Sequence, residues 1–594
     1  MACVHSRLPG QGFRLERNDK MGKLMLGNEA IARGAWEAGV RVISSYPGTP
    51  STEITEYATV YPEINCEWAP NEKVAAEVAF GASMAGARAM TCMKHVGVNV
   101  AADPLFTAAY TGVNAGFVIV CADDPDMHSS QNEQDSRHYA RAAHIPMLEP
   151  ADSEECRAMT ALAFSLSETY DTPVFVRITT RIAHARSTAQ ENPREDIGLR
   201  AYEKNPAKYV MMPAMARDRR AAIRTRMTKL SEDTNSFSLN RMEMRDTTIG
   251  IITSGVNYHY AKEAFPEASV LKLGLVYPLP MALIRTFSKK VQRLVVVEEL
   301  SDFVREQIAA AGIAVDVSSP ENKLGELSRN RVRTELGSPV NMTPTIDYVT
   351  RPPVLCPGCP HRGAFYAIKK LRLNVMGDIG CYTLGALAPT RSIDACLCMG
   401  ASIGMAFGAE KAQGKAFSRH NIALLGDSTF LHSGITPLLD AVYNGGAITV
   451  AILDNRTTGM TGHQENPATG KNIYHEAAPE VDFESLATAL GVRHVRTVDP
   501  YDLTASVEAL REETDRDTVS VIIFKRPCAL LHKEKKPPVL INDCRRCGSC
   551  MNLGCPALMN TDRGVQVSPG LCVGCGLCQR VCPVGAISSE GDMV

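Results

Sequence analysis

The chain has 594 residues, and its 63 Lys and Arg residues nearly balance 65 Asp and Glu residues, which leaves a formal charge of −2. A chain of this length exceeds one hydrophobic core, so three or four domains are expected. With 45% hydrophobic and 22% charged residues, the composition is typical of a globular protein and argues against extensive disorder and against nucleic acid as a partner. No apolar run reaches the roughly 20 residues of a membrane-spanning helix, and the N-terminal sequence lacks the apolar core of a secretory signal, so we expect a cytoplasmic protein with no membrane partner.

The first half of the chain is expected to contain a tail, an α/β domain and a charged segment. Residues 1–20 are polar and are interpreted as an N-terminal tail. From 21 to 190, β-rich runs alternate with small-residue helical stretches, which predicts parallel βαβ units. The clearest of these are strands at 40–46, 116–122 and 172–178 and a helix at 72–89. Residues 191–246 lose the strand pattern, and we interpret them as a linker or surface excursion whose basic run at 217–229 is a solvated face.

The second half is expected to contain two further α/β domains and a cysteine-rich end. An α/β unit is predicted at 247–340, and a Pro-rich joint at 338–355 follows it. A third α/β block is predicted at 350–535, and a separate small domain at 540–594.

Nineteen cysteines in a long cytosolic chain favour metal ligation over disulfides. Eight of them form two runs, C-x2-C-x2-C-x4-C-P at 544–556 and C-x2-C-x2-C-x3-C-P at 572–583. In two-cluster ferredoxins the fourth cysteine of each run serves the other cluster. We therefore predict two 4Fe-4S clusters, one held by Cys544, Cys547, Cys550 and Cys582, the other by Cys572, Cys575, Cys578 and Cys555. The alternatives are zinc sites and incidental cysteines.

A second motif lies at 421–462, where a buried strand, a Gly426-Asp427-Ser428 turn, a crossover helix at 434–444 and another strand follow one another. A right-handed βαβ unit brings the carboxyl ends of its strands together, so Asp427 and Asn455 are expected at one spot. A carboxylate, an amide oxygen and the backbone carbonyl of Thr457 suit Mg²⁺ with a diphosphate. Three glycines would let the backbone approach the phosphates, namely Gly426, Gly459 and Gly462.

This stretch resembles the thiamine diphosphate motif, GD(G/S) followed by a spaced Asn. The alternative is an ordinary strand-to-helix turn, and no nucleotide-binding pattern occurs in a suitable context. Together with tandem ferredoxin clusters, it resembles the 2-oxoacid:ferredoxin oxidoreductases, and the block order is similar to their indolepyruvate ferredoxin oxidoreductase large (alpha) subunits. The resemblance implies a multidomain α/β fold: two doubly wound thiamine-diphosphate-binding domains (pyrimidine-binding at 21–190, diphosphate-binding at 350–535), an intervening transketolase C-terminal-like domain and a two-cluster ferredoxin-like domain.

The resemblance also implies which residues of this chain are catalytic. Thiamine enzymes need a carboxylate against the cofactor's aminopyrimidine ring, and Glu72 matches it; otherwise it is a surface residue complementing a helix dipole. Thr49, in the Tyr46–Pro50 loop, matches a residue near the substrate. His463 departs from the Gly-Gly-Gln of relatives acting on small oxoacids, and either lines a roomier pocket or caps the loop.

In relatives, four cysteines hold a third, proximal 4Fe-4S cluster, and the matching positions here are Cys356, Cys359, Cys381 and Cys528. The alternative is that Cys381 and Cys528 are buried apolar residues. We expect such burial for five others, Cys66, Cys92, Cys121, Cys396 and Cys398.

The implied enzyme is a CoA-acylating indolepyruvate (2-oxoacid) ferredoxin oxidoreductase. It would use thiamine diphosphate and Mg²⁺ to decarboxylate an arylpyruvate-type 2-oxoacid oxidatively, forming an acyl-CoA and CO2 and reducing ferredoxin through its clusters. A smaller beta subunit is the implied partner, in a dimer of heterodimers. Two other classes stay open: a non-redox thiamine diphosphate decarboxylase would turn over without an electron acceptor, and a pure electron-transfer subunit would contain no thiamine diphosphate.

Overall fold

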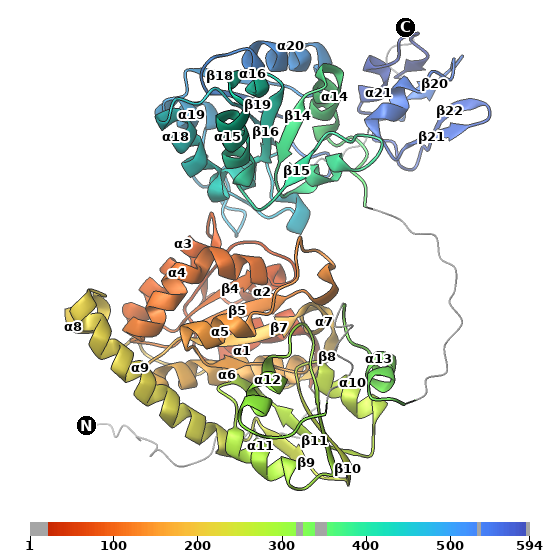
Figure 1. Ribbon diagram of the computed structural model, residues 1–594. Coiled ribbons are helices and arrows are strands. Elements are labelled where there is room, and N and C mark those ends of the chain that lie inside the picture. The colour runs from red at the N-terminus through yellow and green to blue at the C-terminus, as the bar shows by residue number, and fades with distance from the viewer. Residues whose placement is uncertain (1–21, 317–324, 339–352, 532–535, 590–594) are drawn as a thin grey trace. The chain divides into compact units, whose positions relative to one another are not determined.

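The computed structural model describes residues 22–316, 325–338, 353–531 and 536–589 (Figure 1). The chain divides into two compact units on either side of residue 345. The predicted tail at 1–20 and most of the Pro-rich joint at 338–355 lie outside the described residues. In the part of the chain that is described, no helix has the length and apolar character needed to cross a membrane.

The first unit is built on a seven-stranded sheet with the order β12-β6-β7-β5-β4-β2-β3. Its strands are β2 (Val42–Ser45), β3 (Asn65–Trp68), β4 (Ala89–Lys94), β5 (Phe117–Asp123), β6 (Met147–Leu148), β7 (Val174–Thr179) and β12 (Leu275–Tyr277). All neighbours are parallel except β12, which pairs antiparallel with β6 at the edge. The predicted strands at 40–46, 116–122 and 172–178 are confirmed as β2, β5 and β7. β5 and β7 are buried along their whole length, as expected for apolar strands covered on both faces.

Helices cover this sheet, and α1 packs on α6 while α3 packs on α4. They are α1 (Gly27–Glu37), α2 (Thr52–Ala58), α3 (Glu72–Met84), α4 (His95–Thr111), α5 (Arg137–Ala143), α6 (Ser153–Tyr170) and α7 (Thr180–His184). The predicted helix at 72–89 is α3, which starts where the Asn71 side chain accepts a hydrogen bond from the Val74 amide. It ends at Met84, earlier than predicted, and Ala89 already begins β4. A separate strand pair, β1 (Lys23–Leu26) with β8 (Arg186–Ala189), joins the start of this block to its end.

The segment predicted as a linker forms α8 (Pro206–Tyr209), α9 (Pro213–Asp233) and β9 (Arg241–Glu243). Helix α9 packs on α4. Arg219 donates a hydrogen bond to the Tyr110 carbonyl and Arg226, which is buried, donates to the Ala109 carbonyl. The expectation that the whole basic run faces solvent is therefore wrong, because carbonyls near the end of α4 accept hydrogen bonds from these arginines.

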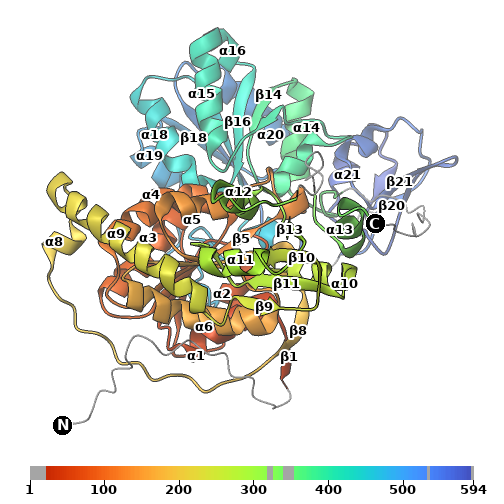
Figure 2. The same ribbon diagram turned by 60° about the horizontal axis from the view of Figure 1, so that its bottom comes forward.

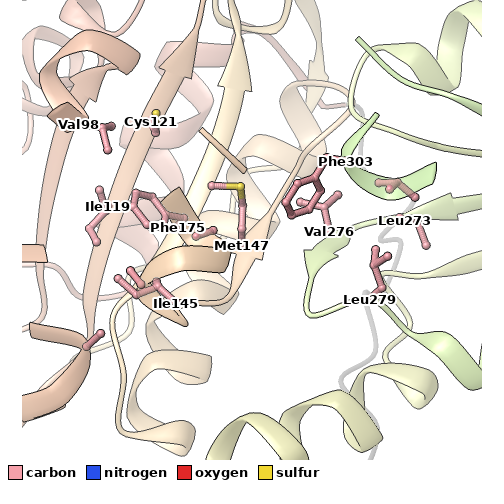
Figure 3. Close-up of a cluster of buried hydrophobic side chains, with 14 of the residues drawn as sticks. Val98, Ile119, Cys121, Ile145, Met147, Phe175, Leu273, Val276, Leu279 and Phe303 are labelled. Carbon is pink, nitrogen blue, oxygen red and sulfur yellow. The ribbon is translucent and has the colours of Figure 1, made fainter. Parts of the chain in front are cut away.

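A second sheet, ordered β13-β10-β11-β9, follows in the first unit (Figure 2). Its further elements are β10 (Asp246–Ser254), β11 (Ala268–Leu273), β13 (Arg293–Val297), α10 (Asn257–Ala264), α11 (Met281–Ser288), α12 (Phe303–Ala310) and α13 (Arg329–Glu335). Figure 3 shows side chains of this block, such as Leu273 and Phe303, packed into the same core as Met147 and Phe175 of the first sheet.

The second unit contains a six-stranded, fully parallel sheet ordered β15-β14-β16-β17-β19-β18. Its strands are β14 (Asn374–Gly377), β15 (Ala395–Cys396), β16 (Asn421–Gly426), β17 (Thr449–Asp454), β18 (His494–Val498) and β19 (Ser520–Lys525). Its α-helices are α14 (His361–Leu371), α15 (Ala401–Gln413), α16 (Lys415–Ser418), α17 (Asp427–Thr429), α18 (Ile435–Tyr443), α19 (Phe483–Ala489) and α20 (Leu503–Thr514). The predicted strand–helix–strand unit at 421–454 is confirmed. Its helical run begins earlier than predicted, however, at Asp427, and passes through a π turn at Phe430–Gly434 into α18.

The cysteine-rich end forms two short antiparallel strand pairs with helical turns between them. The elements are β20 (Leu540–Ile541), η6 (Ser549–Leu553), β21 (Leu558–Thr561), β22 (Gly564–Val567), α21 (Leu577–Arg580) and β23 (Ile587–Ser588). Seven of the eight cysteines lie in or against its apolar core, which also includes Tyr501 and Leu503 from the preceding α/β block, while Cys547 is exposed.

Candidate functional site

Three predicted magnesium ligands converge at the carboxyl ends of β16 and β17. One terminal atom of the Asn455 side-chain amide lies 3.3 Å from Asp427 Oδ1 and 2.9 Å from the Thr457 carbonyl oxygen. As the amide nitrogen it donates a hydrogen bond to both oxygens, and with the amide turned over its oxygen would face them, the orientation that a bound cation would favour. Oxygens with this spacing resemble neighbouring ligands of an octahedral Mg²⁺ bound at about 2.0–2.1 Å. The Thr457 amide also donates to Asp427 Oδ2 at 3.2 Å, which holds the two loops together. The donor set and its spacing therefore fit Mg²⁺.

The electrostatics of Asp427 also suit a cation. Burial, followed by the nearby Asp454 carboxylate, raises the pKa of Asp427 to about 7. A divalent cation beside this carboxylate would favour its ionised form and offset that cost. Ser428 is buried next to it, and its hydroxyl accepts a hydrogen bond from Thr458 at 3.1 Å.

The three predicted glycines differ in what they make room for. A Cβ on Gly426 would lie 2.8 Å from the Tyr382 ring, so only glycine fits at the end of β16. Gly462 has φ 127°, a left-handed conformation that favours glycine. At Gly459 a Cβ would meet nothing closer than Cys381 Sγ at 3.5 Å. Two of the three are therefore required by the local backbone or packing.

His463 lies beside one of the predicted proximal cysteines. Its Nε2 is 3.9 Å from Cys528 Sγ, and its amide donates to the Thr458 carbonyl at 3.1 Å. The side chain is half-buried. His463 therefore faces the cysteine group rather than open solvent.

The other candidate residues belong to the first unit. Glu72 begins α3 and is only 5% exposed, which excludes the alternative of a solvated, dipole-complementing side chain. It packs directly over the first turn of α4, since a Cβ on Gly97 would lie 2.6 Å from Glu72 Oε1. Thr49 follows β2 and is half-buried, and its carbonyl accepts a hydrogen bond from Ser129 at 3.3 Å.

The four proximal cysteines are neighbours in space. Burial raises the pKa of Cys359 to about 12 and of Cys381 to about 11, and in both cases nearby cysteine side chains of the same four raise it further. Burial is likewise the main cause that raises the pKa of Cys528, with Cys356 contributing. Thiols from three distant stretches of chain are thus grouped, and their negative forms are disfavoured without a metal.

The eight C-terminal cysteines line two separate cavities. One small cavity contains Cys555, Cys572, Cys575 and Cys578 in its wall. A second small cavity contains Cys544, Cys547, Cys550 and Cys582. Each cavity wall thus contains the four cysteines that were predicted to bind one cluster, three from one run and the fourth from the other. In the described part of the chain, no group of three or more His, Cys, Asp or Glu side chains is placed so that it could hold a single metal ion.

One cysteine cavity adjoins the proximal group. Its wall includes Gly358 and Arg362, and a Cβ on Gly358 would lie 2.5 Å from Val573 Cγ2 and 3.7 Å from Cys575 Cβ. Arg362 donates to the carbonyls of Leu355 and Cys356 on one side and of Leu553 on the other. The loop at 356–359 therefore packs directly on the cysteine-rich end.

Tyr501 spans the same junction. Its hydroxyl donates to the Gly358 carbonyl at 2.6 Å, and the Cys575 side chain lies within hydrogen-bonding reach of it. Arg526 covers its ring, 3.9 Å from the centroid. Neither Tyr501 nor Arg362 was singled out from the sequence, because contacts across more than a hundred residues leave no local pattern.

The expected burial of five other cysteines is confirmed for Cys66, Cys92 and Cys121 but wrong for Cys396 and Cys398, which are exposed. These two lie on and after β15, an edge strand of only two residues that leaves them uncovered.

Three family models match the chain. "Pyruvate flavodoxin/ferredoxin oxidoreductase, thiamine diP-bdg" matches residues 33–247, and "Thiamine pyrophosphate enzyme, C-terminal TPP binding domain" matches 378–524. "4Fe-4S binding domain" matches 565–588. The models thus identify this as a multidomain α/β protein with thiamine-diphosphate-binding and 4Fe-4S domains.

Curated relatives match almost the whole chain. "Indolepyruvate oxidoreductase subunit IorA" of Archaeoglobus fulgidus is 41% identical, covering 95% of this chain and 97% of that one. The protein of the same name from Methanothermobacter marburgensis is 39% identical, covering 97% and 98%. A solved 2-oxoglutarate:ferredoxin oxidoreductase from Magnetococcus marinus is 19% identical, with a TM-score of 0.45, and covers 53% of this chain and 66% of that one.

Proposed function

Because the chain belongs to the indolepyruvate oxidoreductase subunit IorA family, we propose that it catalyses the oxidative decarboxylation of an arylpyruvate-type 2-oxoacid such as indolepyruvate. The reaction would use thiamine diphosphate and Mg²⁺, transfer the acyl group to coenzyme A and pass electrons to ferredoxin through 4Fe-4S clusters. The observation that carries this proposal is the convergence of the Asp427 carboxylate, the Asn455 side-chain amide and the Thr457 carbonyl at one end of a parallel sheet, in a chain that also has two cavities lined by cysteines.

The site residues have separate roles in this proposal. Asp427, Asn455 and the Thr457 carbonyl would hold Mg²⁺ and, through it, the diphosphate. Glu72 would hold a proton shared with the aminopyrimidine ring, a role for which its burial and its rigid seat over Gly97 are suited. Once bound, thiamine diphosphate supplies the carbon nucleophile and the electron sink that decarboxylation needs.

The cysteines supply a route for single electrons. We infer a proximal cluster on Cys356, Cys359, Cys381 and Cys528, next to the Gly459–Gly462 loop of the cofactor motif. The packing of Gly358 against Val573 supports the cluster of Cys572, Cys575, Cys578 and Cys555 as the next electron acceptor. The cluster of Cys544, Cys547, Cys550 and Cys582 would then be the last in the route and would pass electrons out of the protein.

Ferredoxin would receive electrons from this last cluster. Cys547 is exposed, and so are Arg545 and Arg546 beside it. Two cations beside the outermost cluster would favour the approach of an acidic carrier. The relatives are named as subunits, which supports a partner subunit in the proposed enzyme. We propose that this partner is the smaller beta subunit and that the enzyme is a dimer of heterodimers.

The decisive experiment is an anaerobic assay of the chain together with its partner subunit. Indolepyruvate, phenylpyruvate, pyruvate and 2-oxoglutarate are offered with coenzyme A and a one-electron dye, and acyl-CoA, CO2 and reduced dye are quantified. We expect arylpyruvates to be preferred and dye reduction to require both thiamine diphosphate and coenzyme A. Decarboxylation that proceeds equally without a dye would instead indicate a non-redox decarboxylase, and a purified protein without thiamine diphosphate would contradict the site.

A further inference from the structure

Lys94 is a buried cation at the last position of β4. It is 8% exposed, although a lysine ammonium normally stays in water. Its Nζ donates to the Ser129 carbonyl at 2.7 Å and to the Ser129 hydroxyl at 3.3 Å. Among the described residues, no carboxylate lies within 4.0 Å of it. Two neutral acceptors therefore carry a buried positive charge, which is an expensive arrangement unless an anion joins them.

The nearest carboxylate reaches Lys94 only through a hydroxyl, since the Ser129 hydroxyl that accepts from Lys94 also lies 3.4 Å from Asp124 Oδ2. Asp124, directly after β5, accepts hydrogen bonds from the Ser129 amide at 2.8 Å, from Ser130 at 2.5 Å and from Thr180 at 2.6 Å. These bonds hold both of its oxygens. Asp124 acts on Lys94 only at longer range, and burial lowers the pKa of Lys94 to about 8 in spite of it.

The ammonium is next to the loop that carries Thr49. A Cβ on Gly48 would lie 3.2 Å from Lys94 Cβ, so the loop packs directly on this side chain. The Ser129 hydroxyl bridges the two, since it contacts both Lys94 Nζ and the Thr49 carbonyl, each at 3.3 Å. β2 and β4 are parallel neighbours, so both groups lie at the carboxyl edge of the sheet, where open α/β sheets bind ligands.

We propose that Lys94 binds the carboxylate of the 2-oxoacid substrate and holds its keto carbon beside Thr49. This inference rests on the proposed function. A single buried ammonium among hydroxyl and carbonyl groups matches a monoanionic carboxylate, and the charge of a diphosphate would exceed what it can balance. Lys94 is thus a residue that selects oxoacids over the corresponding aldehydes and amides.

Two variants separate charge from shape. Lys94→Gln keeps a donor for Ser129 but removes the charge, and Lys94→Arg keeps the charge. The control is Lys73→Gln, which changes an exposed lysine of α3 paired with Glu77. We expect the KM for indolepyruvate to rise about 10- to 150-fold in Lys94→Gln, the usual range for a lost charge-assisted hydrogen bond, with a much smaller change in kcat. The control should be unchanged, and Lys94→Arg should retain most of the affinity.

A binding measurement tests the role of Lys94 without relying on catalytic activity. Titration of the thiamine-diphosphate-loaded protein with indole-3-acetate should give a dissociation constant that rises in Lys94→Gln as KM does, while binding of the neutral indole-3-acetamide stays the same. Equal affinity of wild type and Lys94→Gln for indole-3-acetate would overturn the proposal. If the wild type oxidises no oxoacid, the proposed function fails instead, and the titration still decides the role of Lys94. Content of thiamine diphosphate and iron, equal in all variants, confirms correct folding.

Discussion

The position of Glu72 depends on the absence of a side chain at Gly97. The carboxylate lies over Gly97 in the first turn of α4, at a distance that no Cβ tolerates. A glycine there costs helix stability, yet it lets a buried acid sit rigidly against a neighbouring helix. The acid–base role proposed for Glu72 depends on this seat as much as on the carboxylate itself.

Two variants test that dependence. Glu72→Gln should bind thiamine diphosphate but lose about 10²- to 10⁴-fold in rate, because an amide cannot exchange the proton. Gly97→Ala should cause a comparable loss by displacing the carboxylate. The control is Gly81→Ala, because a Cβ at Gly81 meets nothing within 4 Å. Exchange of the bound cofactor's thiazolium proton in deuterated solvent measures the effect, and wild-type exchange in Glu72→Gln would make Glu72 an ordinary helix residue.

Asp427 is the only carboxylate proposed for Mg²⁺. Asp427→Ala should therefore abolish retention of thiamine diphosphate and all turnover, while the iron content stays that of the wild type. Asp440→Ala, an exposed position on the same helical run, is the matched control. Cofactor content after desalting is the measurement, and a normal content in Asp427→Ala would refute the assignment.

The charge of Lys94 predicts a pH dependence. Burial lowers its pKa to about 8, so the ammonium is present below that pH and is lost above it. Since kcat/KM reports the free enzyme, kcat/KM for the oxoacid should be flat to about pH 7.5 and fall as pH rises beyond 8. In Lys94→Arg the guanidinium stays charged, and the fall should disappear. A fall that is identical in both proteins would assign it to another group.

At the scale of elements, the parts predicted correctly are those with a local pattern. Strand, helix and strand at 421–454 were readable from apolar periodicity, and parallel βαβ geometry then brought Asp427 and Asn455 together. The early start of the helix at Asp427 was missed, because Gly426-Asp427-Ser428 has the composition of a turn. Tyr501 was missed for a different reason: its partner Gly358 is 143 residues away in sequence.

Tyr501 tests the junction between the 356–359 loop and the cysteine-rich end. Tyr501→Phe removes the hydroxyl that donates to Gly358 and contacts Cys575. Loss of one such hydrogen bond costs about 1 kcal/mol and loosens the contact, so we expect ferredoxin reduction to slow several-fold with iron and thiamine diphosphate contents unchanged. Tyr443→Phe, at an 85% exposed position, should have no effect. Unchanged electron transfer in Tyr501→Phe would remove this residue from the route.

At the scale of the whole molecule, the order of α/β blocks followed from the sequence but their connection did not. The strand β12 belongs by sequence to the block at 247–340, yet it extends the sheet of the first block by pairing with β6. An edge strand of three residues has too little periodicity to reveal its partner. As a result the two α/β blocks share one hydrophobic core, which Figure 3 shows filled by side chains of both.

The number of clusters is decided by counting iron in the complete chain. Three cubanes correspond to about twelve irons, and two to about eight. Removal of the cysteine-rich end is a poor test, because its core includes Tyr501 and Leu503 of the preceding block and truncation would expose them. Substitution of ligands in the full-length protein avoids this problem.

The double variant Cys356→Ala/Cys381→Ala should therefore lower the iron content of anaerobically purified protein from about twelve to about eight. The matched control is Cys396→Ala/Cys398→Ala, which changes two exposed cysteines of the same α/β block and should leave about twelve. The proximal variant should also lose electron transfer from oxoacid to ferredoxin, because the outer clusters would be cut off from the cofactor. About eight irons in the wild type, unchanged in the double variant, would return those cysteines to the core and leave the two C-terminal clusters intact.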